Sequence, residues 1–227
     1  MTKVTGSFVR SWGRGVVDER YTELSCEEFA DRLAAREGVP GGGGAAALVG
    51  ALGVALCSMA GSFTVGKPRY ADVEDEVRAL MDEAEDVRYR LVELVEEDAE
   101  GFAPLAASYA IPRDDPGRAE ALERATEAAA MAPLAMVGEC CRAVTLLERM
   151  GERCSRLLAS DVACGALLVR AALGAASVNV YVNTSALADR AQAAAIESAC
   201  DELVEEYVPR AERLAERVLA GIRGGSR

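Results

Sequence analysis

Apolar side chains recur every three or four residues along most of this chain, which is the spacing of one face of an α-helix. No alternation of period two lasts long enough to predict a strand. We therefore predict an all-α protein, a bundle of long antiparallel helices. The expected helices, separated by turns rich in Gly, Pro, Asp and Asn, lie near residues 25–37, 45–63, 70–109, 117–151, 160–180 and 188–222.

The helix that begins near Tyr70 has the most regular pattern. Its apolar positions step by four and three, and the next step of the same series falls on Asp98. The series, hereafter the heptad seam, consists of Val73, Val77, Leu80, Ala84, Val87, Leu91 and Leu94. A helix over residues 70–101 would be about 48 Å long, which favours packing against a second subunit. Pro104 is expected to bend or end this helix.

Asp98 is the first candidate for catalysis. A carboxyl at a packed position loses hydration, which raises its pKa and suits it to proton transfer near neutral pH. The same pattern also fits a seam that has already ended, with Asp98 solvated or paired with an arginine. We interpret the neighbouring Glu96, Glu97 and Glu100 as solvated.

Charge and composition narrow the range of functions. The 37 Asp and Glu residues outnumber the 25 Lys and Arg residues, which argues against sequence-independent binding of nucleic acid. Histidine is absent, so Ser-His-Asp triads and histidine-ligated metals are excluded within one chain, and we predict no metal site. Seven cysteines, an odd number without a Cys-x-x-Cys pair, indicate a reducing cytoplasm. Those predicted to be buried, inert thiols are Cys57, Cys140, Cys141, Cys154, Cys164 and Cys200.

The uncharged run from residue 39 to residue 66 is long enough for a membrane span. It is built of Ala, Gly, Ser and Cys, whose transfer into lipid is weakly favourable, and acidic amphipathic helices follow it. We therefore interpret it as the central helix of a bundle outside the membrane. Residues 1–22 lack any period and an apolar signal-peptide core, and are predicted to be a flexible arm before a helical domain over 23–227.

Four consecutive glycines before a helix form the second candidate site. They expose backbone N–H groups where a helix adds partial positive charge, an arrangement that can hold an anion or a carbonyl-rich ligand. The same glycines can also serve only a tight turn with close packing. The candidate residues are Pro40, Gly41, Gly42, Gly43 and Gly44.

Two further segments carry candidate ligand-binding side chains. Lys67 and Arg69 form a small basic spot that can meet a carboxylate, or can serve only as helix-dipole partners. Asn179 and Asn183 lie four apart on one helix face and can present amides to a heterocycle, or can simply close that helix. Ser160 is predicted to be a helix N-cap, with Asp161 in the first turn.

These segments resemble one family. PGGGG before an Ala-rich helix, VGKPRYADVEDE, EEDAEGF, APL, SDVACGALL and ALGAASVNVYVN occur in the order found in the C-terminal domain of formimidoyltransferase-cyclodeaminase. The small stand-alone bacterial methenyltetrahydrofolate cyclohydrolases and cyclodeaminases have the same pattern, which covers about residues 23–222 here. The resemblance implies an all-helical homodimer that closes an N5-formimino group of tetrahydrofolate onto N10 with loss of ammonia, or opens the methenyl bridge with water. It implies a tetrahydrofolate derivative as substrate, with no prosthetic group.

The resemblance also implies roles for individual residues. Asp98 matches the acidic residue thought to transfer protons, and the other matched positions are expected to bind the substrate. They are Pro40, Gly41, Gly42, Gly43, Gly66, Lys67, Tyr70, Ser160, Asp161, Asn179 and Asn183. Arg69, beside Lys67, is expected to help hold the ligand. Gly44 departs from the family, which commonly has a small hydroxyl residue there. This departure leaves two alternatives open: a non-folate substrate on the same scaffold, or a non-catalytic helical dimer that binds a ligand.

Overall fold

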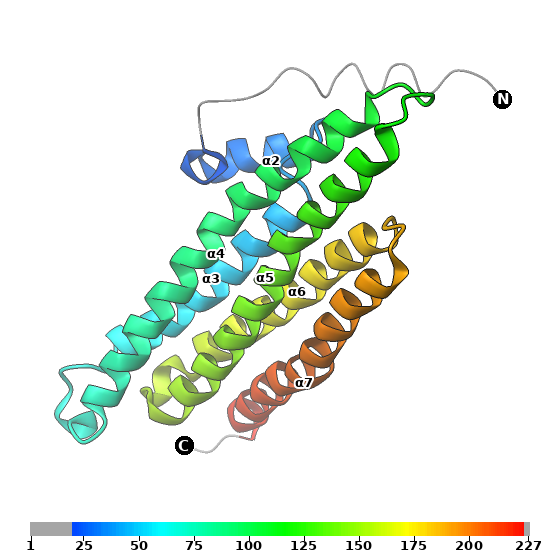
Figure 1. The fold of residues 1–227 in the computed structure, drawn as a ribbon. Coiled ribbons are helices and arrows are strands. Elements are labelled where there is room, and N and C mark those ends of the chain that lie inside the picture. Colours follow the sequence, from blue (N-terminus) through cyan, green and yellow to red (C-terminus); the bar gives the residue numbers. More distant parts are fainter. Residues whose placement is uncertain (1–19, 225–227) are drawn as a thin grey trace.

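Five long helices lie side by side and run alternately up and down, and a short helix crosses them near one end (Figure 1). The computed structural model describes residues 20–224, and no strand occurs within that range, so the predicted all-α class is confirmed. The α-helices are α2 (Cys26–Ala34), α3 (Gly42–Ser62), α4 (Glu74–Tyr109), α5 (Arg118–Arg153), α6 (Ala159–Thr184) and α7 (Arg190–Arg223). Short 3-10 helices are η1 (Tyr21–Glu23), η2 (Pro68–Tyr70) and η3 (Arg156–Leu158).

The core lies between α3, α4, α5 and α6. Helix α3 packs against α4 and α6, and α5 contacts α3, α4, α6 and α7. The heptad seam of α4 faces this core, and its residues from Val77 to Leu94 are fully buried, as predicted. Ser25 and Glu28 form the predicted capping box at the start of α2.

Helices α3 and α6 approach each other backbone to backbone. A Cβ atom on Gly53 would lie 2.9 Å from the carbonyl oxygen of Gly165, and a Cβ atom on Gly165 would lie 2.8 Å from the carbonyl oxygen of Gly53. Neither position can hold a larger residue without a shift of the backbone. The small residues of α3 therefore serve a close helix crossing.

Several predicted local features are wrong. Pro104 was expected to bend or end its helix, and it does not end it, because α4 continues to Tyr109. Ser160 is not an N-cap, since α6 begins at Ala159 with Leu158 at the cap position. Cys164 is exposed, whereas the other five cysteines predicted to be buried are buried and free.

Three helical segments have the length and apolar composition needed to cross a membrane: Gly42–Ser62, Arg118–Arg153 and Arg156–Thr184. In the fold, 56%, 56% and 44% of their most apolar windows are buried against other helices. The placement of the run 39–66 outside a membrane stays a prediction. Most of the predicted arm lies outside the described residues; its last members, Tyr21 and Thr22, belong to η1.

Candidate active site around Asp98

The carboxyl of Asp98 lies against the first turn of α3. Its Oδ2 accepts a hydrogen bond from the backbone N–H of Gly44 across 3.0 Å. A Cβ atom on Gly43 would lie 2.3 Å from Oδ1, so only glycine leaves room for the carboxyl. The glycines that were expected to form a loop are therefore the first residues of α3, with Gly41 as the N-cap.

Burial dominates the electrostatics of Asp98. Loss of hydration raises the pKa of this carboxyl to about 6, and the hydrogen bond from Gly44 opposes the rise only in part. Among residues 20–224, Asp98 makes no ion pair, so the structure supports the partly desolvated carboxyl over the arginine-paired alternative. Glu97 pairs with Arg90. A carboxyl that has no ion-pair partner and a pKa near neutrality is suited to exchanging protons.

Glu96 is not simply solvated, as the sequence suggested, but receives two hydrogen bonds from Thr22. The backbone N–H and the hydroxyl of Thr22 donate to Oε1 of Glu96 across 2.9 Å and 3.0 Å. The two residues are 74 positions apart in the chain, and no local pattern signals such a contact. Sequence reasoning therefore missed the attachment of η1 to α4, two residues before Asp98 in the chain.

Asn179 and Asn183 of α6 lie at the same end of the bundle. A Cβ atom on Gly42 would be 3.4 Å from Nδ2 of Asn179, so that amide borders the start of α3. Nδ2 of Asn183 donates to the carbonyl oxygens of Ala129 and Asn179 at 2.9 Å and 3.0 Å. These bonds occupy both N–H donors of Asn183 and leave its carbonyl oxygen to accept from a ligand.

The remaining predicted residues lie at the opposite end of the bundle, hereafter the Lys67 end. Lys67, Arg69 and Tyr70 follow the C-terminus of α3, whose 21 residues span about 30 Å. Ser160 and Asp161 lie in the first turn of α6, at this same end. A hydrogen bond of 2.9 Å from the N–H of Ser155 to Oγ1 of Thr64 joins the two loops there.

Within one chain, then, the structure divides the predicted residues into two groups. Asp98, the glycines and the two asparagines form the Asp98 end. The Lys67 end consists of Lys67, Arg69, Tyr70, Ser160 and Asp161. Two groups about 30 Å apart cannot both contact one small ligand in a single copy of the chain.

Gly44 leaves the site itself unchanged. Position 44 is the third residue of α3, whose N-cap is Gly41, so a hydroxyl residue at position 44 would not be the N-cap. A Cβ atom on Gly44 would contact Cβ of Pro40 and Cγ1 of Val95, each at 3.6 Å. A side chain at position 44 would therefore point toward packed apolar atoms. The replacement of the family's hydroxyl residue by Gly44 gives no reason to expect a different ligand.

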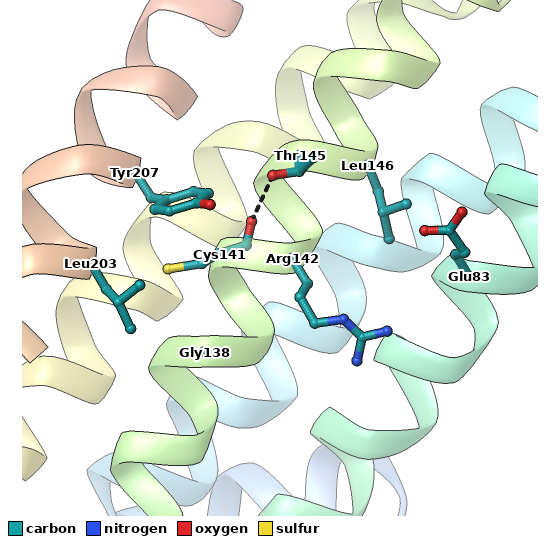
Figure 2. Close-up of a pocket in the computed structure, with 8 residues that line it drawn as sticks. All are labelled: Glu83, Gly138, Cys141, Arg142, Thr145, Leu146, Leu203 and Tyr207. Carbon is teal, nitrogen blue, oxygen red and sulfur yellow. Dashed lines mark hydrogen bonds between the residues drawn. The ribbon is translucent and has the colours of Figure 1, made fainter. Parts of the chain in front are cut away.

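A shallow pocket of about 320 Å³ lies elsewhere, where α5 faces α4 and α7 (Figure 2). Tyr207 and Leu203 of α7 face Cys141 and Gly138 of α5, while Glu83 of α4 lies across from Arg142. None of the predicted site residues lines it. Within residues 20–224, no three or more Asp, Glu and Cys side chains are grouped so as to hold a metal ion.

The chain belongs to the formiminotransferase-cyclodeaminase family, whose model matches residues 25–202. Methenyltetrahydrofolate cyclohydrolase of Methylorubrum extorquens is 34% identical over 196 residues, which cover 85% of this chain and 94% of that protein. The crystal structure of formiminotetrahydrofolate cyclodeaminase from Thermotoga maritima matches with a TM-score of 0.76 and 29% identity, covering 87% of this chain and 98% of that one.

A third relative is larger. Formimidoyltransferase-cyclodeaminase of Rattus norvegicus is 26% identical over 176 residues, which cover 76% of this chain but only 32% of that protein. This chain therefore spans about a third of the length of that relative. The family resemblance noted in the sequence is confirmed.

Proposed function

We propose that this protein is a folate one-carbon enzyme that cyclises formiminotetrahydrofolate with release of ammonia or hydrolyses methenyltetrahydrofolate. Family membership and near full-length similarity to a cyclohydrolase and a cyclodeaminase support the substrate class. The observation that carries the mechanism is the half-buried carboxyl of Asp98, with its raised pKa, at the start of α3.

Asp98 would act as general base and then as general acid. In cyclisation it takes the proton from the attacking N10 amine and returns it to the formimino nitrogen, which leaves as ammonia. In hydrolysis it takes a proton from water as the oxygen bonds to the methenyl carbon, and returns it to the ring nitrogen whose bond breaks. The proton of the new hydroxyl is released to solvent as the formyl C=O forms. A pKa of about 6 leaves the carboxyl ionised at neutral pH yet ready to carry a proton.

The substrate carbon is already electrophilic, because the amidine or amidinium group withdraws electrons through both nitrogens. The proposed reaction therefore uses neither a metal nor a prosthetic group. The amides of Gly42 and Gly43, in the positive first turn of α3, would bind carbonyl oxygens of the ligand. Asn179 and the carbonyl oxygen of Asn183 would orient the pterin ring.

A homodimer would bring the Asp98 end of one subunit close to the Lys67 end of the other. Helices α3 and α6 lie behind α4 and α5 (Figure 1), and each leaves one face uncovered by the other described helices. That face is apolar, with exposed fractions of 53% for Leu52, 57% for Val178 and 63% for Val182. Helix α3 carries no charged residue. A second copy seated antiparallel there would shield an apolar surface.

In such a dimer, the Asp98 end of one subunit would meet the Lys67 end of the other. Lys67 and Arg69 of the partner subunit could then bind the glutamyl carboxylates of the ligand. Burying the α3–α6 face between copies fits a protein that lies outside the membrane. Buried free thiols fit the cytoplasm, and the net charge of −12 fits a protein without a nucleic-acid partner.

The test is a spectrophotometric assay of the purified protein with methenyltetrahydrofolate and, separately, with formiminotetrahydrofolate, combined with measurement of released ammonia. We expect turnover of at least one substrate, and ammonia only from the second, which identifies the reaction. Asp98→Asn should lose this activity while it keeps the hydrogen bond to Gly44. Full turnover by Asp98→Asn would refute the mechanism, and a folded protein inactive on both substrates would refute the folate assignment.

A further inference from the structure

The segment from Tyr21 to Gly41, hereafter the strap, is tied to α4 at both of its ends. At its beginning, Thr22 donates two hydrogen bonds to Glu96. At its end, the chain enters α3, where Gly44 donates to Asp98. Glu96 and Asp98 are two residues apart on α4, so their side chains point about 200° apart around the helix axis. The strap therefore passes around α4 from the side of Glu96 to the side of Asp98.

Apolar contacts also hold the strap, because Tyr21, Leu24 and Phe29 pack against the core. Phe29 is the one buried residue of α2, and the rest of that helix is largely exposed. An ion pair of 3.1 Å between Arg32 and Glu37 closes the turn after α2, but it joins the strap only to itself. Pro40 packs beside the Cα of Gly44 at the far end. The two hydrogen bonds from Thr22 to Glu96 add to these apolar contacts a polar attachment that fixes the start of the strap on α4.

The first turn of α3 needs such support because it is intrinsically weak. Gly42, Gly43 and Gly44 each lower helix stability by about 1 kcal/mol relative to alanine. The N-cap is Gly41, which supplies no side-chain acceptor. If the strap moves away from α4, this turn can fray, and Asp98 then loses both its hydrogen-bond donor and the surface that desolvates it.

We infer that Glu96 is a positioning residue, which acts through Thr22 and the strap to hold the first turn of α3 against Asp98. This inference rests on the proposed function for its effect on turnover, but not for its effect on the structure. Glu97 provides a matched control, because it is adjacent to Asp98, carries the same charge and pairs with Arg90 instead of the strap.

The experiment compares Glu96→Ala, Thr22→Val, Thr22→Ser and Glu97→Ala in the full-length protein. Hydrogen–deuterium exchange of the peptide over residues 41–48 should quicken about tenfold in Glu96→Ala, since the strap no longer holds that turn. It should quicken less in Thr22→Val, which keeps one donor, and stay near wild type in Thr22→Ser and Glu97→Ala. Where a folate is turned over, kcat should fall about tenfold in Glu96→Ala, with KM changed less than twofold.

Two outcomes would overturn the inference. One is exchange in Glu96→Ala equal to that of Glu97→Ala; the other is an equal loss of kcat in both variants, which would indicate a mere change of charge. If Glu96→Ala loses its structure globally, the comparison of exchange in Thr22→Val with exchange in Thr22→Ser decides the question. Quickened exchange in a protein that turns over neither folate would support the role of Glu96 and refute only the proposed function.

Discussion

The backbone N–H of Gly44 donates to Oδ2 of Asp98 across 3.0 Å, so a carboxylate on α4 caps the N-terminus of α3. The same carboxylate is the proposed proton carrier. Burial raises its pKa, whereas the hydrogen bond favours its charged form, and burial has the larger effect. One side chain thus links the packing of two helices to the chemistry of the site.

The first prediction concerns the pH dependence of turnover. A general base must be ionised to accept a proton, so kcat/KM should rise with pH through an apparent pKa of about 6. An ordinary aspartate would give a profile already flat above pH 5. The measurement is a pH–rate profile from pH 4.5 to 8.5, and a profile without an inflection near 6 would contradict the assignment.

The second prediction concerns stability. The folded-state pKa of Asp98 is raised from 3.8 to about 6, so the folded protein holds this proton more tightly than the unfolded chain. The resulting stabilisation is complete below pH 4 and is lost as pH rises through 6. Asp98→Asn should therefore gain stability over wild type across that window, by about 2 kcal/mol after allowance for partial exposure.

Denaturant unfolding of both proteins at pH 4, 5, 6 and 7 measures this difference. Other carboxyls contribute equally to the two proteins and cancel in the comparison. A constant difference at all four values would show that Asp98 titrates normally.

The third prediction contrasts two adjacent glycines. Gly43→Ala places a Cβ atom 2.3 Å from Oδ1 of Asp98 and must displace the carboxyl, so turnover should fall about 100-fold. Gly44→Ala meets only ordinary contacts at 3.6 Å and should keep most of the activity. It should also stabilise the protein by about 0.5 to 1 kcal/mol through its better helix propensity. Equal kinetics for the two variants would argue against a fitted carboxyl.

The fourth prediction concerns the crossing of α3 and α6. Gly53→Ala brings a Cβ atom within 2.9 Å of the carbonyl oxygen of Gly165, so we expect a loss of about 2 to 3 kcal/mol in unfolding free energy. Gly138→Ala in α5 is the matched control, because nothing lies within 4 Å of its Cβ position. Thermal unfolding should show a lower Tm for the first variant and an unchanged or higher Tm for the second.

The fifth prediction tests the shared site. Asp98→Asn and Lys67→Ala should each be impaired as homodimers. After the two are unfolded and refolded together, about half of the dimers are mixed, and each mixed dimer has one intact site, which restores about a quarter of wild-type activity. No recovery on mixing, with mixed dimers present on a native gel, would refute a site shared between subunits.

Much of this fold can be predicted from the sequence because its helices are long and periodic. The heptad seam of α4 located Asp98 correctly at the edge of the core, since burial follows helical spacing. The start of α3 could not be predicted: glycines favour turns locally, and only the carboxyl of Asp98 and the packing of Pro40 make them helical. The separation of Lys67 from Asp98 could not be predicted either, because the order of motifs along the chain does not give the distance between them in the fold.

The length of helix α3 has a geometric consequence. Its 21 residues set the separation between the Asp98 end and the Lys67 end, and a symmetric pair of chains would have to match that length at two places at once. Inserting one residue would turn one end by about 100° relative to the other, and inserting four would lengthen the span by about 6 Å in each subunit. In the proposed dimer, the number of residues in α3 is therefore under a geometric constraint that the connections between helices do not share.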